Sequence, residues 1–123
     1  MLVEVSNGEI IDKLTILKIK IEKIDDPAKL ENLRREHEVL SKAAGSIMDE
    51  ADPLFVKLLD INRELWGIED RIRDLERRGE FGQEFIDTAR SVYFTNDKRS
   101  EVKREINLST GSNLIEEKSY EKY

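Results

Sequence analysis

The chain has 123 residues, of which 39% are charged and 38% hydrophobic, and its formal net charge is −6. A typical soluble domain carries about 25% charged residues, so this composition favours long amphipathic helices with a narrow apolar stripe and disfavours a thick globular core. Acidic and basic residues alternate along the chain and there is no cysteine, which argues against a basic nucleic-acid footprint and excludes disulfides and thiolate metal sites.

Two helices are expected in the first half of the chain. Ser6 and Glu9 have the spacing of a capping box, which places the start of the first helix at about Asn7. Its apolar residues form a seam with alternating steps of four and three and are Ile10, Leu14, Leu17, Ile21 and Ile24. Further isoleucines widen this surface, so we expect the first helix to contact more than one neighbour. Asp26 and Pro27 end the connection and begin a second helix, and the short turn predicts an antiparallel hairpin over residues 7–48.

The strongest pattern lies between residues 53 and 78. Its seam again alternates steps of four and three and comprises Leu54, Leu58, Ile61, Leu65, Ile68, Ile72 and Leu75. This spacing matches one face of an α-helix, whereas the faces of a strand repeat every second residue. Asp52 and Pro53 suit the start of this helix, and Gly79 suits its end. A fourth helix is expected over residues 83–107, antiparallel to the third, which gives a second hairpin over residues 53–108.

These patterns predict an all-α protein in which two antiparallel hairpins form a long four-helix bundle or a coiled-coil-like assembly. We expect a single domain over residues 1–123, in which residues 109–123 form a charged tail that is either disordered or docked on the bundle. Helices with narrow apolar stripes often complete their burial by self-association, so a homodimer is expected.

The fourth helix interrupts its own apolar seam. The spacing that begins at Phe85 places Asn96, Arg99 and Lys103 where apolar side chains are due. Burying an unpaired charge costs several kcal/mol. Three outcomes are therefore open: the helix rotates, the polar groups form a hydrogen-bonded network, or they line a pocket.

Pairing the third and fourth helices about the turn collects polar residues into a band across both, with Arg90 opposite Asp70. Such a band either fixes the register of the helices or forms a ligand or partner site. With Lys13 and two tail residues added, the candidate site comprises Lys13, Trp66, Asp70, Arg73, Arg90, Tyr93, Asn96, Asp97, Arg99, Lys118 and Tyr120. Gly67 lies inside the band. A glycine within a helix costs about 1 kcal/mol relative to alanine, so a close backbone approach is one reason for its presence.

No catalytic residue, metal site or cofactor is expected. The chain has no glycine-rich phosphate loop, nucleophile elbow or HExxH motif, and its single histidine, His37, is weak support for a metal. One enzymatic alternative is a bundle that binds a small dianion and rearranges it by electrostatics and positioning, as small all-helical chorismate mutases do. A cage of Lys13, Arg73, Arg90 and Arg99 would serve that purpose.

The preferred interpretation is a non-enzymatic helical interaction or scaffold module. No apolar run approaches the 18 or more residues of a membrane span, and the first residues do not resemble a signal peptide. We therefore expect a cytoplasmic homodimer with a possible protein partner and without nucleic-acid or membrane partners.

Four stretches carry a resemblance to a known family. They are GEIIDKLTIL at residues 8–17, LWGIEDRIR at residues 65–73, ARSVYFTNDKR at residues 89–99 and EEKSY at residues 116–120. They resemble an uncharacterised family, defined by a domain of unknown function, of short all-helical bacterial and phage-type proteins. The resemblance covers nearly the whole chain and implies that the tail belongs to the domain and folds back onto it. It brings no assigned chemistry, so it leaves the function open.

Overall fold

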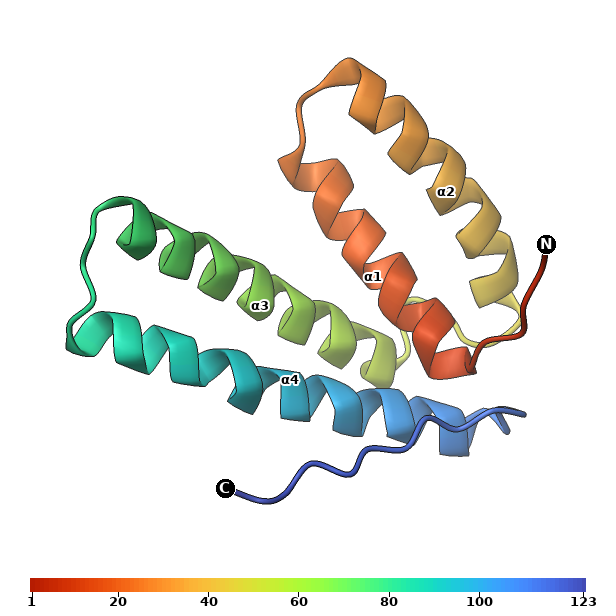
Figure 1. The fold of residues 1–123 in the computed structure, drawn as a ribbon. Coiled ribbons are helices and arrows are strands. Elements are labelled where there is room, and N and C mark those ends of the chain that lie inside the picture. Colours follow the sequence, from red (N-terminus) through yellow and green to blue (C-terminus); the bar gives the residue numbers. More distant parts are fainter.

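A computed structural model describes all 123 residues and contains four helices and no strand. The helices are α1 (Asn7–Lys23), α2 (Pro27–Gly45), α3 (Pro53–Arg77) and α4 (Gln83–Ser109). They account for 72% of the chain. Figure 1 shows α1 and α2 as one antiparallel hairpin and α3 and α4 as another. The all-α bundle predicted from the sequence is therefore confirmed.

The helix boundaries follow from local capping groups. The side chains of Ser6, Asp26 and Asp52 accept hydrogen bonds from first-turn amides of α1, α2 and α3, as predicted. Gly79 ends α3 in the left-handed region with φ of 65°, where a side chain would be strained. The carboxylate of Glu9, the second residue of the expected capping box, accepts a hydrogen bond from Lys103 of α4, because α4 lies within reach of the first turn of α1.

The central element of the bundle is α1. It packs against α2, α3 and α4, whereas α2 packs against α1 alone. The prediction that α1 has more than one neighbour is confirmed. The arrangement differs from a regular four-helix bundle, because α2 lies outside a three-helix unit of α1, α3 and α4 (Figure 1). The reason is visible in the burial: α2 buries only Ala44, so it has one narrow contact face, whereas α1 buries residues on several sides.

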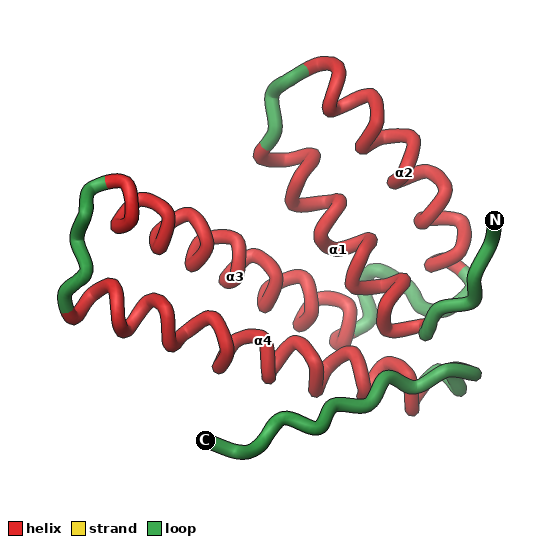
Figure 2. The backbone as a smooth tube through the Cα atoms, in the orientation of Figure 1, coloured by secondary structure: helices red, strands yellow, loops and turns green.

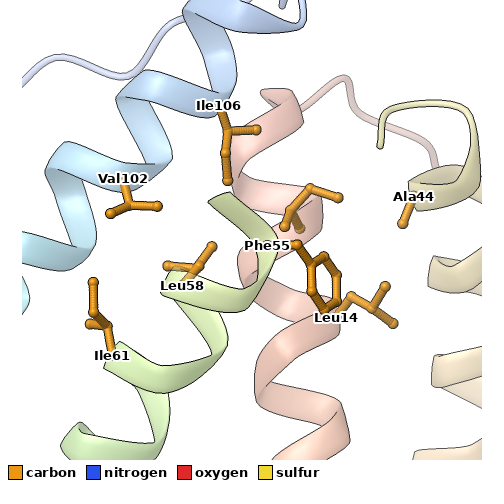
Figure 3. Close-up of a cluster of buried hydrophobic side chains, with 8 residues drawn as sticks. Leu14, Ala44, Phe55, Leu58, Ile61, Val102 and Ile106 are labelled. Atoms are coloured by element: carbon orange, nitrogen blue, oxygen red, sulfur yellow. The ribbon is translucent and has the colours of Figure 1, made fainter. Parts of the chain in front are cut away.

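A small apolar core lies where α1 crosses the α3–α4 hairpin (Figure 3). Phe55 of α3 points toward Leu14 of α1, and Leu58 lies near Ile106 of α4. The full cluster of buried apolar residues is Ile11, Leu14, Ala44, Phe55, Leu58, Ile61, Val102 and Ile106. Only 18 of 123 residues are buried, which agrees with the narrow apolar stripes of the sequence.

The tail runs back along α4. Figure 2 shows the last residues as an extended segment that turns at the end of α4 and then follows that helix towards its middle. The turn contains Gly111 with φ of 66°. The hydroxyl of Ser112 accepts a hydrogen bond from the Asn7 amide at 3.0 Å. The tail therefore packs against the helices, as the resemblance implied.

Candidate functional site

A buried polar network joins α1, α3 and α4. Asp12 of α1 is only 1% exposed. Its carboxylate accepts hydrogen bonds from Asn62 Nδ2 of α3 at 2.9 Å and from Arg99 Nε of α4 at 2.9 Å. Arg99 makes a second bond to the other carboxylate oxygen, so the pair is bidentate. Asn62 also donates to the hydroxyl of Thr15 at 2.8 Å. One carboxylate thus ties three helices together.

The charge of Arg99 is held in place by this pairing. The hydrogen bond to Asp12 raises the pKa of Arg99 and outweighs burial, which lowers it. The side chain of Arg99 is 30% exposed, so the guanidinium lies at the edge of the core with its bonded side facing inward. Of the three outcomes left open by the sequence, Arg99 follows the second: it belongs to a hydrogen-bonded network.

A second set of polar contacts joins the start of α1 to the end of α4. The Gly8 amide donates to Asn107 Oδ1 at 2.6 Å, and Lys103 Nζ donates to Glu9 Oε2 at 2.8 Å. Burial lowers the pKa of Lys103, but its hydrogen bond to Glu9 and the neighbouring carboxylates raise the pKa above the ordinary value overall. These contacts fix α1 and α4 as antiparallel neighbours in one register.

Gly8 is the glycine that permits a close backbone approach. A Cβ atom at Gly8 would lie 2.5 Å from the carbonyl oxygen of Lys103 and 3.0 Å from Asn107 Oδ1. Nothing lies within 4 Å of a Cβ built at Gly67. The suggestion that Gly67 allows a close approach is therefore wrong, and the helix contact that needs a glycine is between α1 and α4.

Six of the eleven predicted site residues line one open groove between α4 and the tail. The groove has a volume of about 1450 Å³, and the six residues are Tyr93, Asn96, Asp97, Arg99, Lys118 and Tyr120. The hydroxyl group of Tyr123, at the end of the tail, donates a hydrogen bond to Asp97. Its ring packs 5.3 Å from the ring of Tyr93 and 4.9 Å from that of Phe94, measured between centroids. The polar residues of α4 thus contact α1 on one side, through Arg99, and the tail on another side, through Asp97.

The other five predicted residues do not line this groove. Lys13 and Asp70 are exposed, and Trp66 is half-buried on α3. The guanidinium of Arg73 is paired with Glu69 of its own helix.

Arg90 does not pair with Asp70 as predicted. It donates to the Tyr93 hydroxyl at 3.3 Å and lies 5.7 Å from the centre of the Phe94 ring. Arg73, Arg90 and Arg99 therefore have three different sets of partners, and the four-residue cage for a dianion is not assembled.

The family comparison accounts for the whole chain. The family of unknown function DUF6165 matches residues 1–123. The chain belongs to DUF6165. No curated protein and no solved structure matches it with significance. In this DUF6165 protein no group of three or more His, Cys, Asp or Glu side chains is placed to hold a metal ion. None of its helices has both the length and the apolarity that crossing a membrane requires.

Sequence reasoning missed the α1 half of the polar network in this DUF6165 chain. Gly8, Glu9, Asp12 and Thr15 were not among the candidate residues, although all four lie in its first helix. A usable signal was present, because Asp12 and Thr15 stand three apart among isoleucines and leucines and therefore share a helix face with apolar neighbours. Because polar residues were paired only within the α3–α4 hairpin, Asp12 of α1 was not predicted as the partner of Arg99.

Proposed function

We propose that this DUF6165 protein is a non-enzymatic helical interaction module that acts as a homodimer. The observation that carries the proposal is the solvent-accessible surface area of the chain. The chain exposes 8413 Å², whereas a compact monomer of 14.3 kDa is expected to expose about 6,800 Å². The excess, about 1,600 Å², is roughly twice what each partner buries in a standard protein–protein interface. The excess surface is therefore large enough to supply one partner's share of a stable dimer interface.

The surface best suited to association is the end of the molecule where the N-terminal segment lies against the end of α4 and the start of the tail. Residues 106–115 contain no charged side chain, in a chain that is 39% charged. Asn113 Nδ2 donates to Glu4 Oε1 at 2.9 Å and thereby holds the N-terminal segment against this uncharged run. These two segments carry six exposed apolar side chains, which we call the terminal patch: Leu2, Val3, Val5, Leu108, Leu114 and Ile115.

A second copy of the chain is the partner that fits the terminal patch. The cores of interfaces are depleted in charged residues, and in a two-fold dimer the same patch meets itself. An apolar patch is self-complementary under that symmetry, because the same apolar side chains meet their own copies; the carboxylate of Glu4, which stands between Val3 and Val5, is hydrogen-bonded to Asn113. Val39 on α2 offers a contrast, because it has Glu38 beside it and Glu36 and Lys42 close by in the sequence.

The test is a matched pair of substitutions measured by light scattering. Leu108→Asp places a charge in the terminal patch, and Val39→Asp places the same charge on α2; the two side chains are 59% and 69% exposed, so neither change disturbs the core. We expect Leu108→Asp to weaken dimerisation by about a hundredfold or more, the effect of burying an unpaired charge, and Val39→Asp to leave it unchanged. Equal dimerisation of both variants would remove the terminal patch from the proposal.

A further inference from the structure

The face of α4 that lines the groove between α4 and the tail already contacts an extended peptide, the chain's own tail, which forms the opposite wall of the groove. Near the end of α4, Glu116 of the tail accepts a hydrogen bond from Lys103 Nζ at 3.3 Å, and Glu117 accepts one from Arg104 at 3.0 Å. Towards the middle of α4, the Tyr123 hydroxyl donates to Asp97. Two successive glutamates and a tyrosine six residues later are thus contacted by one face of one helix.

The α4 side of this groove is preformed, whereas the tail is peripheral. Lys103 has a side chain only 12% exposed and is also held by Glu9 of α1, so it stays in place without the tail. Tyr93 and Phe94 form an aromatic pair on α4 itself, with centroids 4.8 Å apart. In contrast, every residue from 113 to 123 is exposed. The tail can therefore leave without opening the apolar core, and the groups that contact it would remain on α4.

We propose that this face of α4 binds, in place of the tail, an extended acidic peptide of another polypeptide with adjacent glutamates and a tyrosine about six residues towards its C-terminus. Lys103 and Arg104 bind the glutamates. Phe94 and Tyr93 pack against the tyrosine ring, and Asp97 accepts the tyrosine hydroxyl, which selects tyrosine over phenylalanine. The tail is then an internal competitor of the external peptide.

The competition is measurable with the full-length chain and a fluorescein-labelled peptide of residues 116–123. A loosened-tail variant, Glu116→Gln with Glu117→Gln and Tyr123→Ala, keeps the length of the chain but removes the tail contacts. We expect this variant to bind the peptide saturably and about tenfold or more tightly than the wild-type chain, because a tethered tail has an effective concentration in the millimolar range. Fluorescence anisotropy gives both dissociation constants.

Substitutions in the groove test the site itself. In the loosened-tail variant, Arg104→Ala and Phe94→Ala are each expected to weaken peptide binding about fivefold or more, consistent with the loss of one charged or aromatic anchor. Arg34→Ala on α2 is the matched control and should leave binding unchanged. A peptide with phenylalanine in place of its last tyrosine should bind more weakly, because Asp97 then lacks its donor.

Three results would overturn this inference: no saturable binding to the loosened-tail variant, equal affinity of that variant and the wild-type chain, or no effect of Arg104→Ala. The α4 groups that bind the peptide, Asp97, Lys103 and Arg104 among them, are not part of the terminal patch. The Leu108→Asp change, added to the loosened-tail variant, should therefore leave the peptide affinity unchanged. Loss of peptide binding with an intact dimer would reject the groove alone, and a monomer that binds the peptide would reject the dimer alone.

Discussion

Replacing Asp12 with asparagine removes the buried charge that joins α1, α3 and α4 and hardly changes the side-chain volume. The side-chain oxygen of an asparagine can still accept from Asn62 Nδ2 and Arg99 Nε, which share Asp12 Oδ1, but its amide nitrogen is a donor where Asp12 Oδ2 accepts from Arg99. At least one donor then faces another donor. The bidentate interaction with Arg99 is lost with it, and the guanidinium keeps its charge at the edge of the core.

The size of the effect follows from the contacts. Hydrogen bonds to charged groups contribute about 1.5–3 kcal/mol each, and Asp12 accepts two of them from Arg99. Since the Arg99 side chain is 30% exposed, water compensates part of the loss. We therefore expect the free energy of unfolding to fall by about 2–4 kcal/mol, which corresponds to a decrease in Tm of about 10 °C for a chain of this size.

Urea denaturation followed by circular dichroism measures this change. Asp70→Asn is the matched control, because Asp70 is exposed on α3, and it should shift the free energy of unfolding by less than about 0.5 kcal/mol. A double-mutant cycle with Arg99→Ala should give a coupling energy of about 1–3 kcal/mol. If Asp12→Asn changes the free energy of unfolding as little as Asp70→Asn does, the network does not hold the three helices together.

Two further predictions concern the glycines and the tail. Gly8→Ala should destabilise the protein by about 2–4 kcal/mol, as expected for a steric clash in a packed contact, because its Cβ would lie 2.5 Å from the carbonyl oxygen of Lys103. Gly67→Ala should stabilise the protein by up to about 1 kcal/mol. Thermal denaturation measures both changes in stability, and changes of the same sign would contradict the close contact between α1 and α4. The hydrogen bond to Asp97, with smaller contributions from burial and nearby charges, raises the pKa of Tyr123 to about 12, so the tail contact is fully present below pH 10 and is lost as the pH rises through 12. Absorbance at alkaline pH should show one late-titrating tyrosine that disappears in Tyr123→Phe, and identical titration curves for the two proteins would reject the contact.

Much of the fold could be predicted because its signals are local. The cap residues Ser6, Asp26 and Asp52 and the turn at Gly79 each act within one turn of helix, so the sequence contains all the information that determines them. The seam of α3 likewise depends only on spacing. Its predicted start at Pro53 is confirmed, and its end at Arg77 lies one residue before the predicted position.

The contacts between helices distant in sequence could not be predicted in the same way. Asp12 and Arg99 are 87 residues apart, and nothing in either helix alone states which partner its polar face meets. The interruption of the α4 seam correctly marked Arg99 as unusual, but the antiparallel hairpin suggested partners on α3 only. The role of Gly8 was hidden for the same reason, since a close approach is a property of two helices and not of one.

The proposed dimer is tested most directly by sedimentation equilibrium of the wild-type chain. At about 100 µM, well above a dissociation constant of about 1 µM, we expect a mass twice the 14.3 kDa of one chain, with dissociation on dilution. The Leu108→Asp variant should sediment as a monomer at the same concentration. A wild-type mass of 14.3 kDa at about 100 µM would contradict the proposed dimer.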